Sequence, residues 1–151
     1  ESRAFVTGNL INFDADELPI KRYQFIHEMT HVWQNQNVGP VYLGHAIFSQ
    51  IAQGDAAYNY GYNTGDGGIS LPNADYNGGV EPSISEGFAT GEGAQAVLSA
   101  PGADFMGFNP ERQGQIMMHY FVRRVLLNQA PATYAPWQTF ATFVQSHPQV
   151  A

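Results

Sequence analysis

The 151-residue chain contains no cysteine, which excludes a disulfide-stabilised scaffold, a thiolate metal site and a cysteine nucleophile. Charged residues make up only 13% of the sequence, and six Lys and Arg stand against thirteen Asp and Glu, for a net charge of -7. Lys and Arg are absent from residues 23–111, where nine acids lie. This composition disfavours nucleic acids and anionic membranes as partners, because both need a basic surface, and the acidic middle portion would attract cations.

No apolar run approaches the roughly 18 residues of a transmembrane helix, so we expect no membrane span. With 44% hydrophobic and 13% aromatic residues, the chain has enough apolar material for one folded core but is too short for two. We therefore expect residues 1–151 to form a single domain. The chain starts at Glu1 and not at Met, which is typical of a processed product or of a domain cut from a longer polypeptide.

The sequence pattern predicts a mainly α-helical fold with a small β element. Two apolar runs around Thr7-Gly8-Asn9 predict a short strand or hairpin within residues 3–13. Helices are expected over residues 19–37, 41–52 and 83–99, from Asn109 onward with Arg123 and Arg124 in the last turn, and from Pro136 to before Pro148. The first of these is apolar on more than one face, so we expect a buried central helix.

The first expected helix carries the motif His27-Glu28-Met29-Thr30-His31, or HExxH. Residues four apart lie on one face of a helix, about one turn apart, so both imidazoles can reach the same Zn²⁺. Glu28 beside the first ligand is placed to hold the water that the metal activates and to take its proton. A random order of this composition would contain about 0.007 copies of the motif. The motif therefore predicts a catalytic zinc site with Glu28 as general base.

A catalytic zinc site needs a third protein ligand, and its fourth position is left for water. The chain lacks the HExxHxxGxxH pattern, in which a third histidine follows closely, because residue 34 is Gln and residue 37 is Asn. We therefore expect an acid on another helix, and the residues leave two candidates, Glu111 and Glu86. Glu111 lies in the first turn of a well-capped helix, where Gly114 one turn later would permit close packing. Glu86 also lies among small residues that would permit it.

Each of these assignments has a structural alternative. His27 and His31 could be core histidines bonded to carbonyl groups, or the metal they hold could be purely structural. Glu111 could merely complement a helix N-terminus, and Glu86 could be a solvated acid. Even with these alternatives, HExxH is the strongest indication of function in the sequence.

Further side chains could assist such a site. His119, eight residues after Glu111 and about 80° around the helix from it, could face the edge of a cleft and donate to the oxyanion. The sequence does not rank the other possible donors, which are Tyr62, Tyr134 and His45. An acid that orients a ligand histidine is also expected, and the candidates are Asp75, Asp104 and Glu92. Two large aromatic residues, Trp33 and Tyr120, are expected to pack in the core.

Two segments resemble a known family. His27-Glu-Met-Thr-His-Val-Trp-Gln34 resembles the HE(L/M)THVWQ box of small zinc metallopeptidases that occur beside or fused to Rhs and VgrG proteins of bacterial type VI secretion. Residues 108–121 resemble that family's second box, roughly N-x-E-Q-Q-A-x-I-x-x-D-Y-F. Residues 4–13 are similar to the strand that precedes the motif helix there, and Tyr58-Asn-Tyr60 to an aromatic pair between the boxes.

The resemblance implies a glutamate-zincin arrangement with His27, His31 and Glu111 as Zn²⁺ ligands and Glu28 as base. It also implies an effector that forms the C-terminal part of a VgrG spike protein and acts in the periplasm of a target bacterium. The implied partners are a protein or peptide substrate, the secretion spike and an immunity protein, without nucleic acid.

The departures of the chain from the family pattern include positions 114 and 119. Gly114 stands where the family has the similarly small Ala, and His119 stands where an Asp is usual. The leading hypothesis is nevertheless a zinc metallopeptidase of zincin-like fold, in which the HExxH helix packs against a second ligand-bearing helix. The alternatives are a catalytically silent, zinc-bearing binding or adaptor module and a metal-free helical interaction domain.

Overall fold

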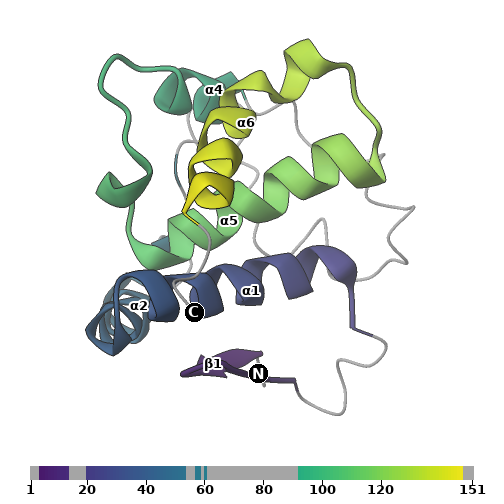
Figure 1. Cartoon of the computed structure of the whole chain (residues 1–151). Helices are drawn as coiled ribbons and strands as arrows, with labels where there is room; N and C mark the ends of the chain where they lie inside the picture. Colours follow the sequence, from purple (N-terminus) through teal and green to yellow (C-terminus); the bar gives the residue numbers. More distant parts are fainter. Residues whose placement is uncertain (1–3, 14–19, 54–56, 59, 61–91, 148–151) are drawn as a thin grey trace.

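The computed structural model describes residues 4–13, 20–53, 57–58, 60 and 92–147 (Figure 1). This part of the chain is mainly helical with a two-stranded antiparallel hairpin, which confirms the predicted class. The hairpin pairs β1 (Phe5–Thr7) with β2 (Leu10–Asn12). It is followed by α1 (Arg22–Asn37) and α2 (Pro40–Gln53), close to the two helices expected there. No helix among the described residues is long and apolar enough to cross a membrane.

The second half of the described chain is also helical. Its elements are α4 (Glu92–Leu98), the short 3₁₀ helix η4 (Phe105–Gly107), α5 (Pro110–Phe121), the π-helical segment η5 (Val122–Leu126) and α6 (Pro131–Ser146). α4 coincides with the end of the helix expected over residues 83–99, whose earlier residues lie outside the described ones. α5 begins as the sequence predicts, because the Asn109 side chain accepts a hydrogen bond of 2.8 Å from the backbone N–H of Arg112.

α1 ends at the predicted glycine. Gly39 has a φ of +103°, which residues with a side chain rarely adopt. Its N–H bonds to the carbonyl oxygens of Gln34 and Asn35, at 3.3 and 3.1 Å, and so satisfies carbonyl groups of the last helical turn. Pro40 then starts α2, which packs against both α1 and α5.

α1 and α5 form the centre of the fold (Figure 1). The hairpin lies on the side of α1 that faces away from α5, and α6 packs on the opposite side of α5. Burying one Phe or Ile side chain in this core contributes about 1.5–3 kcal/mol to the free energy of unfolding. Trp33 packs against the core and Tyr120 lies within it, as expected. The innermost core residues, each at most 5% exposed, are Leu98, Phe105, Ile116, Val122, Trp137 and Phe140.

The last helix starts five residues earlier than the sequence predicts. The expected start at Pro136 is wrong, since α6 begins at Pro131, which takes the favoured first helical position. Pro136 therefore lies inside the helix, where it removes one backbone hydrogen bond. The helix tolerates this loss because the same segment buries Trp137 and Phe140 in the core.

α1 is central but is not buried on all faces, which corrects the expectation drawn from its apolar pattern. Phe25 and Met29 are 42% and 38% exposed. The buried face of the helix carries mostly polar side chains instead, namely His27, Glu28, Thr30, His31 and Gln34. The motif thus lies in the interior, against α5.

The helix expected from Asn109, with Arg123 and Arg124 in its last turn, ends differently in the structure. Arg123 and Arg124 fall in η5, where the N–H of Leu127 bonds at 2.8 Å to the carbonyl of Val122, five residues earlier. Arg124 is exposed, but Arg123 is buried and its guanidinium lies 4.2 Å from the ring centroid of Trp137. Arg123 therefore stabilises the packing of α6 through a cation–π contact instead of projecting into solvent at a helix end.

Candidate metal centre

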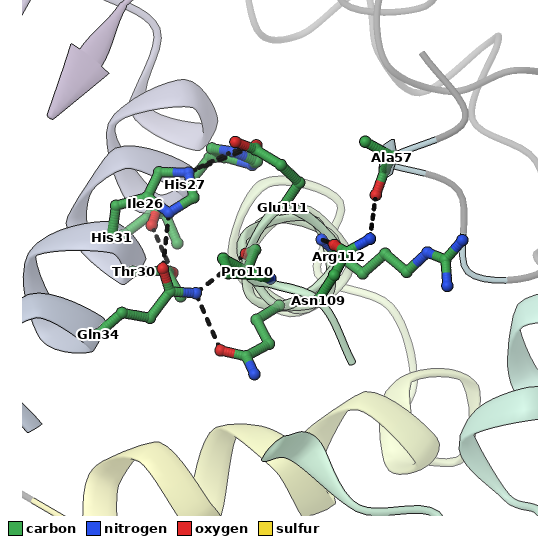
Figure 2. Close-up of polar contacts among 11 residues, drawn as sticks. Ile26, His27, Thr30, His31, Gln34, Ala57, Asn109, Pro110, Glu111 and Arg112 are labelled. Atoms are coloured by element: carbon green, nitrogen blue, oxygen red, sulfur yellow. Dashed lines mark hydrogen bonds and ion pairs between the residues drawn. The ribbon is translucent and has the colours of Figure 1, made fainter. Parts of the chain in front are cut away.

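α1 and α5 bring His27, His31 and Glu111 together in the interior (Figure 2). The Nε2 atom of His27 lies 3.2 Å from Nε2 of His31 and 3.2 Å from Oε2 of Glu111. Nε2 of His31 lies 3.5 Å from the same carboxylate oxygen. None of the three residues is more than 7% exposed. The fold thus assembles the group expected with Glu111, while the alternative Glu86 lies outside the described residues.

The spacing of these atoms fits a zinc ion. Bonds of 2.0–2.2 Å at tetrahedral angles put ligand atoms ~3.3–3.6 Å apart. The three observed separations are 3.2, 3.2 and 3.5 Å. Two imidazoles and one carboxylate are also the donor set of catalytic zinc sites that keep one position for water. In the part of the chain that the structure describes, no other group of three His or acidic side chains converges in this way.

The carboxylate of Glu111 and the imidazole of His31 form a buried ion pair. Burial lowers the pKa of His31, but the hydrogen bond and the charge of Glu111 outweigh it and raise that pKa to about 9. Burial in turn raises the pKa of Glu111, yet hydrogen bonds from both histidines hold it well below its usual range. Without a metal the protonated ring of His31 therefore balances the buried carboxylate at neutral pH, and a divalent cation would displace that proton on binding.

We expect the chelator-treated protein to lose stability as the pH rises above 6.5. The pKa of His31 is about 9 in the folded protein and 6.5 in the unfolded chain. Its proton therefore contributes stability that is complete below pH 6.5 and is lost as the pH rises through 9, by at most about 1.4 kcal/mol per pH unit. Thermal unfolding between pH 6 and 10 measures this slope. Glu111→Ala is the control, and a wild-type slope no steeper than in that variant would contradict the ion pair.

A glycine lets the two ligand helices approach closely. Gly114 lies one turn after Glu111 on α5, and a Cβ atom at this position would stand only 2.6 Å from Cε1 and 2.8 Å from both nitrogens of His27. The ring of His27 therefore occupies the space that any other side chain at position 114 would fill. This confirms that Gly114 permits the close packing, and it shows that even the similarly small alanine would not fit without a shift of the ring.

Gly114→Ala should accordingly weaken zinc binding by about 10–100-fold, the range seen when groups that orient metal ligands are lost. Overpacking costs about 1–3 kcal/mol and is partly offset by about 1 kcal/mol of helix propensity, so stability should change less than zinc affinity. Chelator competition measures the affinity. Gly44→Ala, inside α2 with no atom within 4 Å of the added Cβ, is the matched control. Wild-type affinity in Gly114→Ala would show that the ring moves without harm.

Glu28 is buried beside the ligands on the same helix, with 7% exposure. Burial lowers the pKa of His31, whereas the charge of Glu111 and then that of Glu28 raise it. The carboxylate of Glu28 is therefore within electrostatic reach of the His31 ring.

His119 lies in the interior and not at the edge of a cleft as expected. It is 1% exposed, and burial together with the positive charge of Arg123 holds its pKa well below the usual value, so the ring is neutral. The Tyr60 hydroxyl accepts a 2.7 Å hydrogen bond from Nε1 of Trp137 and is bonded to Nδ1 of His119. The Tyr60 hydroxyl can therefore donate its hydrogen to Nδ1 of His119. Since Nδ1 then accepts, the hydrogen of the neutral His119 ring lies on Nε2. A role as oxyanion donor stays a prediction.

The other predicted side chains lie elsewhere. His45 is exposed and stacks on Tyr42 with ring centroids 6.5 Å apart, and Tyr134 packs edge-on against a neighbouring tyrosine. Asp104 is exposed and caps η4 by accepting a 3.2 Å hydrogen bond from the N–H two residues later, so it is not the group that orients a ligand. Outside the described parts of the chain lie Tyr62, Asp75 and the side chain of Glu92.

Two residues that the sequence analysis does not assign lie against the ligands. Oε1 of Gln34 is 2.8 Å from Nδ1 of His31, and the half-buried ring of Tyr58 lies with its centroid 5.9 Å from that of His27. Gln34 has a sequence signal, because it follows His31 by one turn on the same helix face. Tyr58 has none beyond its resemblance to an aromatic pair, since only tertiary structure brings it to α1.

Comparison with known proteins does not assign the chain to a family. No family model matches it, and neither a curated protein nor a solved structure was found to be similar. The geometry and the donor set of the three converging side chains therefore characterise the centre.

Proposed function

We propose that this chain is a zinc-dependent peptidase in which His27, His31 and Glu111 hold the metal and Glu28 is the general base. The observation that carries the proposal is the convergence of three buried ligand atoms within 3.2–3.5 Å of one another. Structural zinc sites usually have four protein ligands, whereas three converge among the described residues. A structural site would also not require the buried carboxylate of Glu28.

When bound, zinc in such a centre polarises a carbonyl group and lowers the pKa of its bound water to roughly 7. Glu28 would take a proton from the attacking water and pass it to the leaving amine, as the new C–O bond forms and the peptide C–N bond breaks. His119 and Tyr58, which both lie near His27, are candidate donors to the oxyanion.

We further propose that the peptidase is an antibacterial effector delivered with a VgrG spike by type VI secretion. The likeness of residues 27–34 and 108–121 to two sequence boxes of such proteins supports this proposal. Its substrate would be a protein or peptide in the periplasm of the target cell, and an immunity protein would protect the producer. The lack of cysteine makes folding independent of the redox state of that compartment.

Metal removal tests the proposal directly. We expect the purified protein to carry one zinc ion per chain and to cleave unstructured peptides, with the activity lost on chelation and restored by zinc. Magnesium should not restore it, because imidazole ligands suit zinc and not magnesium. Elemental analysis and mass spectrometry of the peptides measure both effects. A protein that neither carries nor takes up zinc would overturn the proposal, and zinc binding without cleavage of any peptide would favour the silent adaptor module.

A further inference from the structure

Two buried glutamines join the two ligand helices. Gln34 of α1 and Gln113 of α5 are both 0% exposed. Nε2 of Gln34 lies 2.9 Å from Oε1 of Gln113 and 3.0 Å from the carbonyl oxygen of Pro110, while its Oε1 lies 2.8 Å from Nδ1 of His31 (Figure 2). Leaving one such buried polar group without a partner costs about 1–3 kcal/mol, so these bonds determine how the amides point.

Backbone carbonyl groups fix the orientation of both amides. Nε2 of Gln113 faces the carbonyl oxygens of Phe105 and Phe108 at 2.9 and 3.0 Å, and carbonyl oxygens accept hydrogen bonds but cannot donate them. Oε1 of Gln113 must therefore face Gln34. Nε2 of Gln34 in turn faces that oxygen and the carbonyl of Pro110, which leaves Oε1 of Gln34 towards His31.

This orientation places the hydrogen of the His31 ring. Because Oε1 of Gln34 can only accept, Nδ1 of His31 must carry a hydrogen and donate it. In the neutral ring, Nε2 then offers its lone pair on the side of Glu111 and His27. A reversed amide would instead favour a hydrogen on Nε2, where it would oppose a metal.

We propose that Gln34 is a positioning residue of the metal centre and that Gln113 holds Gln34 in the required orientation. The inference rests on the proposed function in so far as the centre binds zinc. Gln34 acts on both helices, because it bonds to the ring of one ligand and to the carbonyl of Pro110, the residue directly before Glu111. A single amide thus sets the ring hydrogen of His31 and links α1 to the start of α5.

Two substitutions at position 34 separate positioning from a merely structural role. Gln34→Met removes the acceptor for Nδ1, whereas Gln34→Glu keeps an acceptor there. Both remove the side-chain donor to the Pro110 carbonyl and to Oε1 of Gln113, so both should lower the melting temperature. Chelator competition should show zinc affinity 10–100-fold lower in Gln34→Met, but within about 10-fold of wild type in Gln34→Glu.

Matched variants keep the test informative. Gln36→Met makes the same change two residues along α1, at a glutamine whose side-chain oxygen has no hydrogen-bond partner among the described residues, and should leave zinc affinity unchanged. Gln113→Glu keeps the oxygen that faces Gln34, whereas Gln113→Met removes it. Zinc affinity should therefore be higher in Gln113→Glu than in Gln113→Met, which provides the same comparison should both Gln34 variants fail to fold.

The outcomes distinguish this inference from the proposed function. Equal losses of zinc affinity in Gln34→Met and Gln34→Glu, in proportion to their losses of stability, would overturn the positioning role alone. A wild-type protein that binds zinc but cleaves no peptide would overturn the peptidase and leave the positioning role standing. A wild-type protein that binds no zinc would overturn both.

Discussion

Glu28→Gln should reduce peptide hydrolysis by about 10²–10⁴-fold while zinc stays bound at wild-type affinity. The amide has nearly the shape of the carboxylate but cannot take a proton from water at neutral pH. Glu28 is not one of the three converging ligands, so its charge is not needed to hold the metal. Initial rates of peptide cleavage at equal zinc loading, together with chelator competition, measure the two effects separately.

The control for this variant is Asp104→Asn. It removes one negative charge from an exposed acid, and the asparagine can still accept the hydrogen bond that caps η4. Neither cleavage nor zinc affinity should change. Unchanged cleavage in Glu28→Gln would exclude Glu28 as the base, and a parallel loss of zinc would make it a metal ligand instead.

Glu111→Ala should weaken zinc binding more than the loss of any orienting group, by over ~100-fold, because it removes a ligand itself. Two imidazoles would then have to hold the ion alone. The same variant removes the charge that keeps a proton on His31, so burial would then dominate the pKa of that ring. Zinc affinity by chelator competition and cleavage at saturating zinc are the measurements, and cleavage should fall with zinc occupancy.

Glu86→Ala is the comparison for that variant, because the sequence alone leaves Glu86 as the other candidate ligand. We expect its zinc affinity to stay at the wild-type level. If Glu86→Ala weakens zinc binding and Glu111→Ala does not, the third ligand is misassigned.

Local sequence signals account for much of the fold and for the core of the centre. The histidine spacing of HExxH, the capping residue Asn109 before Pro110, and the stop at Gly39 each act within one or two helical turns. The structure confirms the helix boundaries that depend on them. The same local logic makes Glu111 a candidate ligand, since it lies at a capped helix start with a nearby small residue, but it leaves Glu86 open as well.

The rest depends on contacts between distant segments, which the sequence pattern does not encode. Both Pro131 and Pro136 can begin a helix, and in the structure α6 begins at Pro131 and buries Trp137 in the core. The sequence predicts an acid that orients a ligand histidine, whereas the side chain against Nδ1 of His31 is Gln34, whose amide is set by carbonyl groups of Pro110 and of the loop before α5. The contact of Gly114 with a ligand ring likewise exists only once α1 and α5 are packed.

The ligands are separated by 84 residues along the chain, from His27 to Glu111. Since ribosomes add about 5–20 residues per second, several seconds pass between the synthesis of α1 and that of α5. During this interval the growing polypeptide carries the motif without its acid partner. Translation order would thus delay completion of the centre until both helices have been made.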